Sequence, residues 1–342
     1  MSERRKNPPV TPQEPDLTIL RFSKIPLLFR KVVFVDGIAH SGKLMLGPIL
    51  SAYRGVELHR LDTVFEHVAV LQHFGKITME GAVTLMRFEL DEFLYNNMIG
   101  RGVNFRPTDE SSVFNGLKQE RYLRRLFDPT EGDPIIRRIA KERPIYQGLT
   151  HDMLGFAKPC FEAFDPDFFI IEMIRHPLNI AERWLNWGWG ENRYEKDPRS
   201  FILTVESQGR AIPYFARDRS RSYRRLKPGD RVIFDVLSVW NQMLTCYQGL
   251  SRRRRERVLW GKFENFVTNP YPDLVRIERL LRIRRGNKLE PVLRQQRCPR
   301  ELPRDDRPKL RALIQRRATP KGMRALDDMC EQYERFDPVS GR

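Results

Sequence analysis

Short apolar runs alternate with longer helical patterns along most of this sequence. The runs cover residues 32–35, 145–150, 168–174 and 257–263, and they are rich in β-branched and aromatic side chains. Such runs are typical of strands that are buried on both faces of a parallel sheet, and helices between them are typical of crossover connections. The pattern therefore predicts an α/β fold built on a doubly wound parallel sheet.

Two further β segments are expected beside this sheet. Residues 56–62 alternate between apolar and polar side chains, which predicts a second strand, and residues 201–216 hold two apolar runs about Gly209, which predict a hairpin. Helical patterns fill most of the remaining chain, over residues 44–53, 63–127, 153–164, 231–250, 270–282 and 308–336.

The domain organisation follows from the same pattern. Residues 1–26 are polar and rich in proline, so we expect a disordered or loosely docked arm. Residues 27–340 are expected to form a single α/β domain, in which residues 63–143 are a helical insertion beside the sheet. Helices make up the C-terminal region.

The stretch that follows the first predicted strand has the composition of a phosphate-binding loop. Residues 37–43 are GIAHSGK, with the spacing G-x-x-x-x-G-K between a buried strand and a helix. Gly37 and Gly42 allow the backbone to turn its N–H groups inward, and Lys43 supplies a cation for the anion. Leu44 stands where a nucleotide triphosphatase has the Ser or Thr that holds Mg²⁺, so the loop is expected to bind a phosphate-like anion without a metal.

A second anion-binding pattern lies at the end of a later strand. Arg175 follows the apolar run at 168–174, Pro177 starts the next helix, and Arg183 stands eight positions after Arg175. The carboxyl end of a buried strand and the start of the next helix form a common anion site. An ordinary ion pair of Arg175 with a carboxylate is the alternative.

Together these two loops resemble the 5′- and 3′-phosphate motifs of sulfotransferases that use 3′-phosphoadenosine 5′-phosphosulfate (PAPS). Residues 148–151, GLTH, resemble the strand end that carries the histidine base in many members, and residues 259–270 resemble the late strand and its E-x-[FL]-x-x-x-P turn. The resemblance, to bacterial and heparan-type sulfotransferase domains, implies a three-layer P-loop-type fold with PAPS as cofactor. It also implies sulfuryl transfer to an acceptor hydroxyl of a carbohydrate or another small molecule.

The resemblance also implies roles for particular residues. The cofactor would be bound by Gly37, His40, Ser41, Gly42, Lys43, Leu44, Arg175 and Arg183. His151 would act as the general base, with Lys43 stabilising the transferred group, and a histidine is suited to proton transfer near neutral pH. Asp62 is the rival base, because its spacing from the loop matches the glutamate of heparan-type enzymes.

Two positions depart from the family pattern. His40 stands where the family usually has Lys or Arg before Ser-Gly, and Arg183 stands where it has Ser. The departures concern the geometry around the cofactor more than the fold. A late loop with Arg294, Arg297 and Arg300 lies where the family places another 3′-phosphate contact. Acceptor recognition is expected from Arg101, Arg106, Asp109, Trp187 and Trp189.

Composition limits the partners. The formal net charge of +17 predicts an anionic partner such as a nucleotide cofactor or an anionic acceptor, whereas the arginine run at 252–255 is expected to be a solvated helix end, so nucleic acid is not expected. The four cysteines are far apart, which indicates neither a zinc site nor a disulfide framework. Residues 1–15 lack the apolar core of a signal peptide, and no apolar run has the length of a membrane span, so we expect a soluble cytoplasmic protein.

Two other functions remain open at this stage. An ATP- or GTP-dependent kinase is favoured by Lys43 in the triphosphatase position and opposed by Leu44 and by the lack of an obvious Walker-B aspartate. The other function is that of a basic scaffold that binds polyanions and has no catalytic activity. Comparing thermal stabilisation by 3′-phosphoadenosine 5′-phosphate in EDTA with stabilisation by Mg-ATP separates these three hypotheses.

Overall fold

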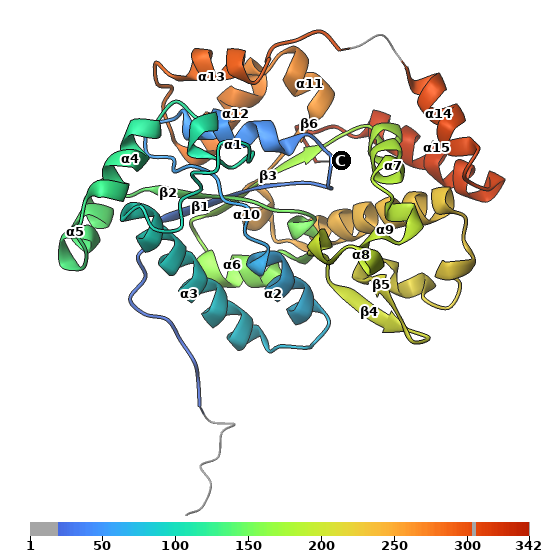
Figure 1. Cartoon of the computed structure of the whole chain (residues 1–342), viewed down its shortest axis with the longest axis horizontal. Helices are drawn as coiled ribbons and strands as arrows, with labels where there is room; N and C mark the ends of the chain where they lie inside the picture. Colours follow the sequence, from blue (N-terminus) through green and yellow to red (C-terminus); the bar gives the residue numbers. More distant parts are fainter. Residues whose placement is uncertain (1–19, 303–305, 342) are drawn as a thin grey trace, which may run out of the picture.

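The protein is organised around a four-stranded parallel sheet (Figure 1). The computed structural model describes residues 20–302 and 306–341. The strands follow the order β2–β1–β3–β6, which are Ile145–Leu149, Lys31–Asp36, Phe168–Ile174 and Val258–Lys262. This confirms the expected α/β fold with a parallel sheet. A separate antiparallel hairpin of β4 (Thr204–Ser207) and β5 (Arg210–Pro213) confirms the turn expected at Gly209.

Each central strand buries both faces, which explains its continuous apolar pattern. In β1, Val32 and Phe34 point into one hydrophobic core, and Val33 and Val35 point into the other. This alternation follows from the two-residue period of a strand. The sheet is thus the middle layer of three.

Helices cover both faces of the sheet (Figure 1). The core on one face includes residues of α2 (Val64–His73), α3 (Met79–Met98), α5 (Asp133–Glu142), α6 (Lys158–Phe164), α7 (Pro177–Asn186), α9 (Pro228–Gly249), α14 (Arg307–Gln315) and α15 (Pro320–Arg335). The core on the other face includes residues of α1 (Leu46–Ser51), α11 (Phe263–Thr268), α12 (Tyr271–Leu281) and α13 (Leu289–Gln295). The remaining helices are α4 (Gln119–Phe127), α8 (Arg193–Lys196) and α10 (Arg252–Arg255). Within the described residues, no helix has the length and apolar character that crossing a membrane requires.

The strand predicted at residues 56–62 is wrong. The segment follows the edge of β2 but forms only isolated bridges, from Val56 to Ile145 and from Arg60 to Gly148. Both rows of side chains are largely buried, and Glu57 is held by an ion pair with Arg125 of α4 at 2.7 Å. Packing against the insertion on one side and the sheet on the other produces the alternation without a continuous ladder.

Two other expectations concern the ends of the chain. The helix predicted over residues 308–336 is two helices, because Thr319 caps a new start by accepting a hydrogen bond from the backbone N–H of Gly322. Most of the predicted N-terminal arm, residues 1–19, lies outside the described residues. Its last part runs along α3, where Lys24 pairs with Asp91 at 3.0 Å.

The order of the strands determines where a site can form. The chain goes from β1 to β2 on one side and then to β3 on the other, so connections leave the centre of the sheet in opposite directions. All four strands are parallel, and their carboxyl ends therefore share one edge. Ligands of such sheets bind outside that edge, where the connections diverge.

Candidate functional site

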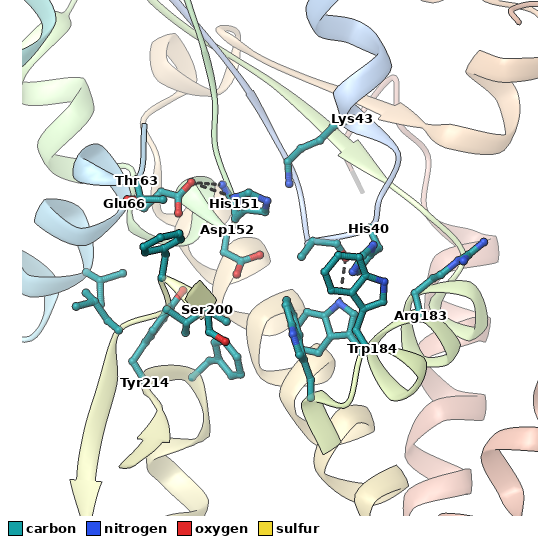
Figure 2. A pocket seen from close by; sticks show the side chains of 18 of the residues that line it. His40, Lys43, Thr63, Glu66, His151, Asp152, Arg183, Trp184, Ser200 and Tyr214 are labelled. Atoms are coloured by element: carbon teal, nitrogen blue, oxygen red, sulfur yellow. Dashed lines mark hydrogen bonds and ion pairs between the residues drawn. The ribbon is translucent and has the colours of Figure 1, made fainter. Parts of the chain in front are cut away.

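A cavity of 610 Å³ lies at the edge where the strands end (Figure 2). It brings together the loop after β1, residues after β2, Arg175 after β3, helix α2 and the segment that follows α7. Of the residues predicted for the site, it is lined by His40, Gly42, Lys43, Leu44, His151, Arg175 and Arg183. The fold thus collects most of the predicted site residues around one space.

The loop after β1 requires its two glycines for different contacts. Gly37 has φ of 145°, and a Cβ there would lie 2.3 Å from the carbonyl oxygen of Met173 in β3. Gly42 has φ of 88°, and a Cβ there would lie 2.3 Å from the ring of Phe263. The loop is therefore packed tightly against the ends of β3 and β6, and a side chain at either glycine would displace it.

Lys43 begins the short 3₁₀ turn Lys43–Met45 that precedes α1, and its side chain is buried. Its Nζ donates a hydrogen bond of 2.5 Å to the carbonyl oxygen of Gly37, which closes the loop on itself. Burial lowers the pKa of Lys43, while the carboxyl groups of Asp36 and Asp152 oppose that shift. Lys43 lines the cavity, and Figure 2 shows its amino group directed into it.

Buried carboxyl groups lie beneath the loop. Asp36 accepts hydrogen bonds from the Thr150 hydroxyl at 3.0 Å and the Leu154 N–H at 2.6 Å, which ties the end of β1 to the segment after β2. Burial raises the pKa of both Glu172 and Asp152 well above the ordinary range, and the neighbouring Asp36 adds to the shift. These groups are close in space only because adjacent parallel strands end together.

Arg175 has an unsatisfied, largely buried guanidinium group. Its Nη1 donates to the carbonyl oxygen of His40 at 3.1 Å, and the guanidinium lies 4.5 Å from the centre of the Phe263 ring. Its Nε is buried and has no hydrogen-bond partner within the described part of the chain. Burial lowers the pKa of Arg175, and the positive charges of Arg183 and Arg300 act in the same direction although Glu264 opposes them. An anion placed here would relieve this repulsion.

A second cavity of 560 Å³ adjoins the first at Arg175 and Arg183, which line both. Its other lining residues come mainly from α7, the end of β6 and the two C-terminal helices, and most are polar or charged: His176, Asn179, Glu182, Lys262, Glu264, Asn265, Asp306, Arg307 and Glu334 among them. The Oδ1 of Asn179 is buried without a hydrogen-bond partner among the described residues. The two arginines therefore stand between a largely apolar cavity and a polar one.

The two positions that depart from the family pattern are both near this junction. His40 has φ of 70°, and its ring centre lies 4.9 Å from that of Trp187. Burial lowers the pKa of His40 to about 4, with Arg183 and Lys43 contributing. The side chain of Arg183 is 55% exposed and pairs with Glu182 at 3.6 Å. Figure 2 shows its guanidinium directed away from the centre of the cavity.

His151 faces the cavity and is held by Glu66 of α2 (Figure 2). The Glu66 carboxylate accepts the backbone N–H of His151 at 2.7 Å and lies 3.2 Å from its Nδ1. The carboxylate therefore favours the tautomer with a proton on Nδ1, which leaves Nε2 free to accept one. No pattern in the sequence pointed to Glu66, because it stands 85 positions before its partner.

The rival base Asp62 lies elsewhere. It is clamped by Arg60, whose Nε and Nη2 donate to its two carboxylate oxygens at 2.6 and 3.2 Å, and it accepts from the Tyr146 hydroxyl at 3.3 Å. It lines a smaller cavity of 200 Å³ beside the insertion, apart from the loop. His151 thus lines the first cavity, whereas Asp62 lines a different one.

The residues expected to bind the acceptor divide into two groups. Trp187 and Trp189 line the first cavity. Arg101 instead pairs with Glu131, and Arg106 pairs with Asp109, in the exposed part of the insertion. Among the described residues, Arg101, Arg106 and Asp109 line neither the first nor the second cavity.

The remaining expectations concern the late arginines and metals. Of the three late arginines, Arg300 has its guanidinium 5.6 Å from the centre of the Phe263 ring, which packs against the loop. In the described part of the chain, no three His, Cys, Asp or Glu side chains are grouped as metal ligands.

Several solved structures share features of this fold at low sequence identity. The sulfotransferase domain from the Synechococcus PCC 7002 olefin synthase is 12% identical with a TM-score of 0.43, and the match covers 93% of this chain and 100% of that chain. The sulfotransferase domain from the curacin biosynthetic pathway is 11% identical with a TM-score of 0.41, over 76% of this chain and 77% of that one.

Sulfotransferase STF9 from Mycobacterium avium is 13% identical with a TM-score of 0.39, over 79% of this chain and 68% of that chain. No family model matches the chain, and no curated protein sequence matches it. In fold, this chain is similar to solved sulfotransferase domains.

Proposed function

We propose that this protein transfers a sulfuryl group from PAPS to the hydroxyl group of a small acceptor. The observation that carries the proposal is Arg175, a partly buried arginine at the junction of two cavities, whose buried Nε has no hydrogen-bond partner among the described residues. One cavity contains the glycine loop and Lys43, and the other is polar. A nucleotide that carries phosphate groups at both its 3′ and 5′ positions needs two anion sites of this kind.

The chain offers each part of the cofactor a suitable surface. The loop and Lys43 would hold the 5′-phosphosulfate, because backbone N–H groups at a helix start and a lysine together form an anion site. Arg175 would hold the 3′-phosphate through charge-assisted hydrogen bonds. Arg183 reaches the same anion if its exposed side chain turns inward from Glu182. The second cavity would hold the nucleoside.

When bound, PAPS supplies a sulfuryl group on a good leaving group, the 5′-phosphate of 3′-phosphoadenosine 5′-phosphate (PAP). Transfer would form a bond between the acceptor oxygen and sulfur and break the sulfur–oxygen bond to that phosphate, which would leave with the electron pair of the broken bond. His151 takes the hydroxyl proton on Nε2 while Glu66 keeps the ring in place. Lys43 stabilises the charge that develops near the loop, so positioning and electrostatics supply most of the catalysis.

The kinase hypothesis has one feature in its favour, which is Lys43 in the triphosphatase position. Leu44 lines the cavity where the magnesium-binding hydroxyl would stand, so that function lacks a metal ligand on the loop. A silent polyanion-binding protein would keep the loop and the charge but would not need a base. We therefore expect activity that depends on His151 and continues in EDTA.

The first test compares three ligands by thermal stabilisation and calorimetry: PAP in EDTA, adenosine 5′-phosphate in EDTA, and ATP with Mg²⁺. PAP should bind most tightly, and Lys43→Ala should weaken it by about 1.5–3 kcal/mol, the usual contribution of a charged hydrogen bond. Lys141→Ala is the matched control, because Lys141 is exposed on α5. Tighter binding of Mg-ATP than of PAP, or equal effects of the two substitutions, would overturn the proposal.

A further inference from the structure

The first cavity has a wall of aromatic side chains. Three tryptophans come from α7 and the segment after it, and three other rings come from the hairpin region: Trp184, Trp187, Trp189, Phe201, Tyr214 and Phe215. Trp184 is fixed in place, since its Nε1 donates to the carbonyl oxygen of Ala39 at 3.0 Å and its ring lies 4.3 Å from that of Trp189. Figure 2 shows Trp184 and Tyr214 on opposite sides of the space below Lys43. A flat apolar group would be enclosed between rigid rings.

Two rings at the rim are exposed without a ligand. Phe201 is 69% exposed and Trp187 is 48% exposed, although both line the cavity. Phe201 also has φ of 37°, an uncommon backbone conformation for a bulky residue, and its carbonyl oxygen lies 3.0 Å from Nε2 of His67. Exposed apolar surface and local strain beside a cavity are typical of ligand contacts, since a ligand would cover the rings.

The charges lining the cavity are segregated. The cationic side chains Lys43, Arg175 and Arg183 belong to the loop, the strand end and the following helix, all of which are assigned to the cofactor. Beside His151 the carboxyl side chains that line the cavity are Glu66 and Asp152, and neither can supply a positive charge. The aromatic wall contributes no cation to the lining described. An acceptor with a carboxylate or sulfate would therefore meet no compensating charge outside the cofactor site.

The size of the cavity limits the acceptor further. A volume of 610 Å³ is in the range of sites for one small molecule, which are about 300–1,000 Å³. The exposed ion pairs of Arg101 and Arg106 lie in the insertion and do not extend this cavity into a charged groove for a polymer.

We infer that the acceptor is an uncharged small molecule with a flat or apolar ring system and a single reactive hydroxyl group, a phenol or a hydrophobic alcohol. This inference rests on the proposed function, of which it specifies the acceptor. The ring system lies between the tryptophans and the Phe201 side, and its hydroxyl group reaches His151. The inference departs from the expectation that the acceptor is anionic or a carbohydrate.

Direct binding tests the inference with saturating PAP present, so that the cations assigned to the cofactor, Lys43, Arg175 and Arg183, are occupied. We would titrate the full chain with 2-naphthol and, in parallel, with 6-hydroxy-2-naphthoic acid, following intrinsic tryptophan fluorescence and confirming by calorimetry. The two probes share their rings and differ by one carboxylate. With PAP bound, 2-naphthol should bind at least about tenfold more tightly than the acid, because the carboxylate loses its hydration without gaining a cation. Equal or tighter binding of the acid, or binding of glucosamine but not of 2-naphthol, would overturn the inference.

Substitutions of cavity residues test where 2-naphthol binds. Phe201→Ala and Trp187→Ala should each weaken 2-naphthol binding about tenfold, as expected for loss of a stacked ring. Phe127→Ala is the matched control, since Phe127 is 79% exposed at the end of α4, away from the cavity. Equal affinities for all three variants would overturn the inference.

Separate measurements distinguish this inference from the proposed function. PAP binding to the same variants should be unchanged, and sulfuryl transfer from PAPS should follow the order of acceptor affinity. If 2-naphthol binds as expected and PAP does not bind, the cofactor assignment fails while the ring-binding site stands. If PAP binds and the carboxylated probe is the better acceptor, the acceptor class is wrong while the proposed function stands.

Discussion

Replacing Glu66 by glutamine should impair catalysis without impairing cofactor binding. The glutamine side chain has nearly the same shape and keeps one acceptor oxygen, so the backbone N–H of His151 keeps a partner, but the negative charge beside Nδ1 is lost. That charge stabilises the imidazolium that forms when His151 takes the acceptor proton. The substitution therefore raises the free energy of the transition state through His151, because Glu66 positions that side chain.

The expected size follows from the contact. A hydrogen bond between charged groups contributes about 1.5–3 kcal/mol and a neutral one about 0.5–1.5 kcal/mol, so the charge is worth about 1–1.5 kcal/mol here. The Glu66 side chain is 14% exposed, which limits screening by water. Each 1.36 kcal/mol changes a rate about tenfold. Glu66→Gln should thus lower kcat about five- to tenfold and leave the affinity for PAP within about twofold.

The assay is transfer of labelled sulfuryl from PAPS to 2-naphthol, with PAP affinity measured in parallel. Glu120→Gln is the matched control, since the side chain of Glu120 is 91% exposed on α4. His151→Ala should lower turnover about 10²–10⁴-fold, the usual contribution of a general base. If Glu66 acts through His151, adding Glu66→Gln to His151→Ala should cost nothing more.

Two results would refute this reasoning. One is a loss in the double variant that equals the product of the two single losses, because Glu66 would then act independently of His151. The other is an unchanged kcat with weakened PAP binding, because Glu66 would then serve only the structure of the cofactor site.

Three further predictions concern other residues. Asp62→Asn should leave turnover within about twofold of the wild type, since Asp62 lies outside the cavity, and a loss comparable to that of His151→Ala would restore Asp62 as the base. Arg175→Ala should weaken PAP about 10- to 100-fold more than it weakens adenosine 5′-phosphate in calorimetry, whereas equal losses would show a structural role. Burial raises the pKa of Asp235 to about 7, so the folded state binds the extra proton and the free energy of unfolding falls as the pH rises from about 4 to 7. Asp235→Asn should remove that fall, which is at most about 3 kcal/mol between pH values of about 5 and 8 in denaturant titrations, and an unchanged pH dependence would contradict the prediction.

The sequence by itself determined the loop and the strands that hold it. Buried parallel strands must be apolar on both faces, so the run before Gly37 and the run before Arg175 were recognisable without coordinates. A loop that turns its backbone N–H groups toward an anion needs glycine, and Gly37 and Gly42 were predicted for that reason. Both are local requirements, met within a few residues of chain.

Local patterns were insufficient where two packing surfaces shared one segment. The alternation at residues 56–62 is the same whether the segment forms a ladder or lies between the insertion and the sheet, so the strand prediction was wrong there. Local patterns were also insufficient to choose between His151 and Asp62 as the general base. Spacing along the chain treats both as candidate bases, whereas the Arg60 clamp on Asp62 is visible only in three dimensions.

Only the tertiary structure decided which distant residues meet. Glu66 reaches His151 because α2 packs beside the end of β2, and no periodicity connects positions 85 residues apart. The aromatic wall and the segregation of charge around the cavity arise in the same way, from helices and a hairpin that converge on one edge of the sheet. Contacts at long separation depend on the path of the whole chain, and for that reason the acceptor site had to be read from the structure.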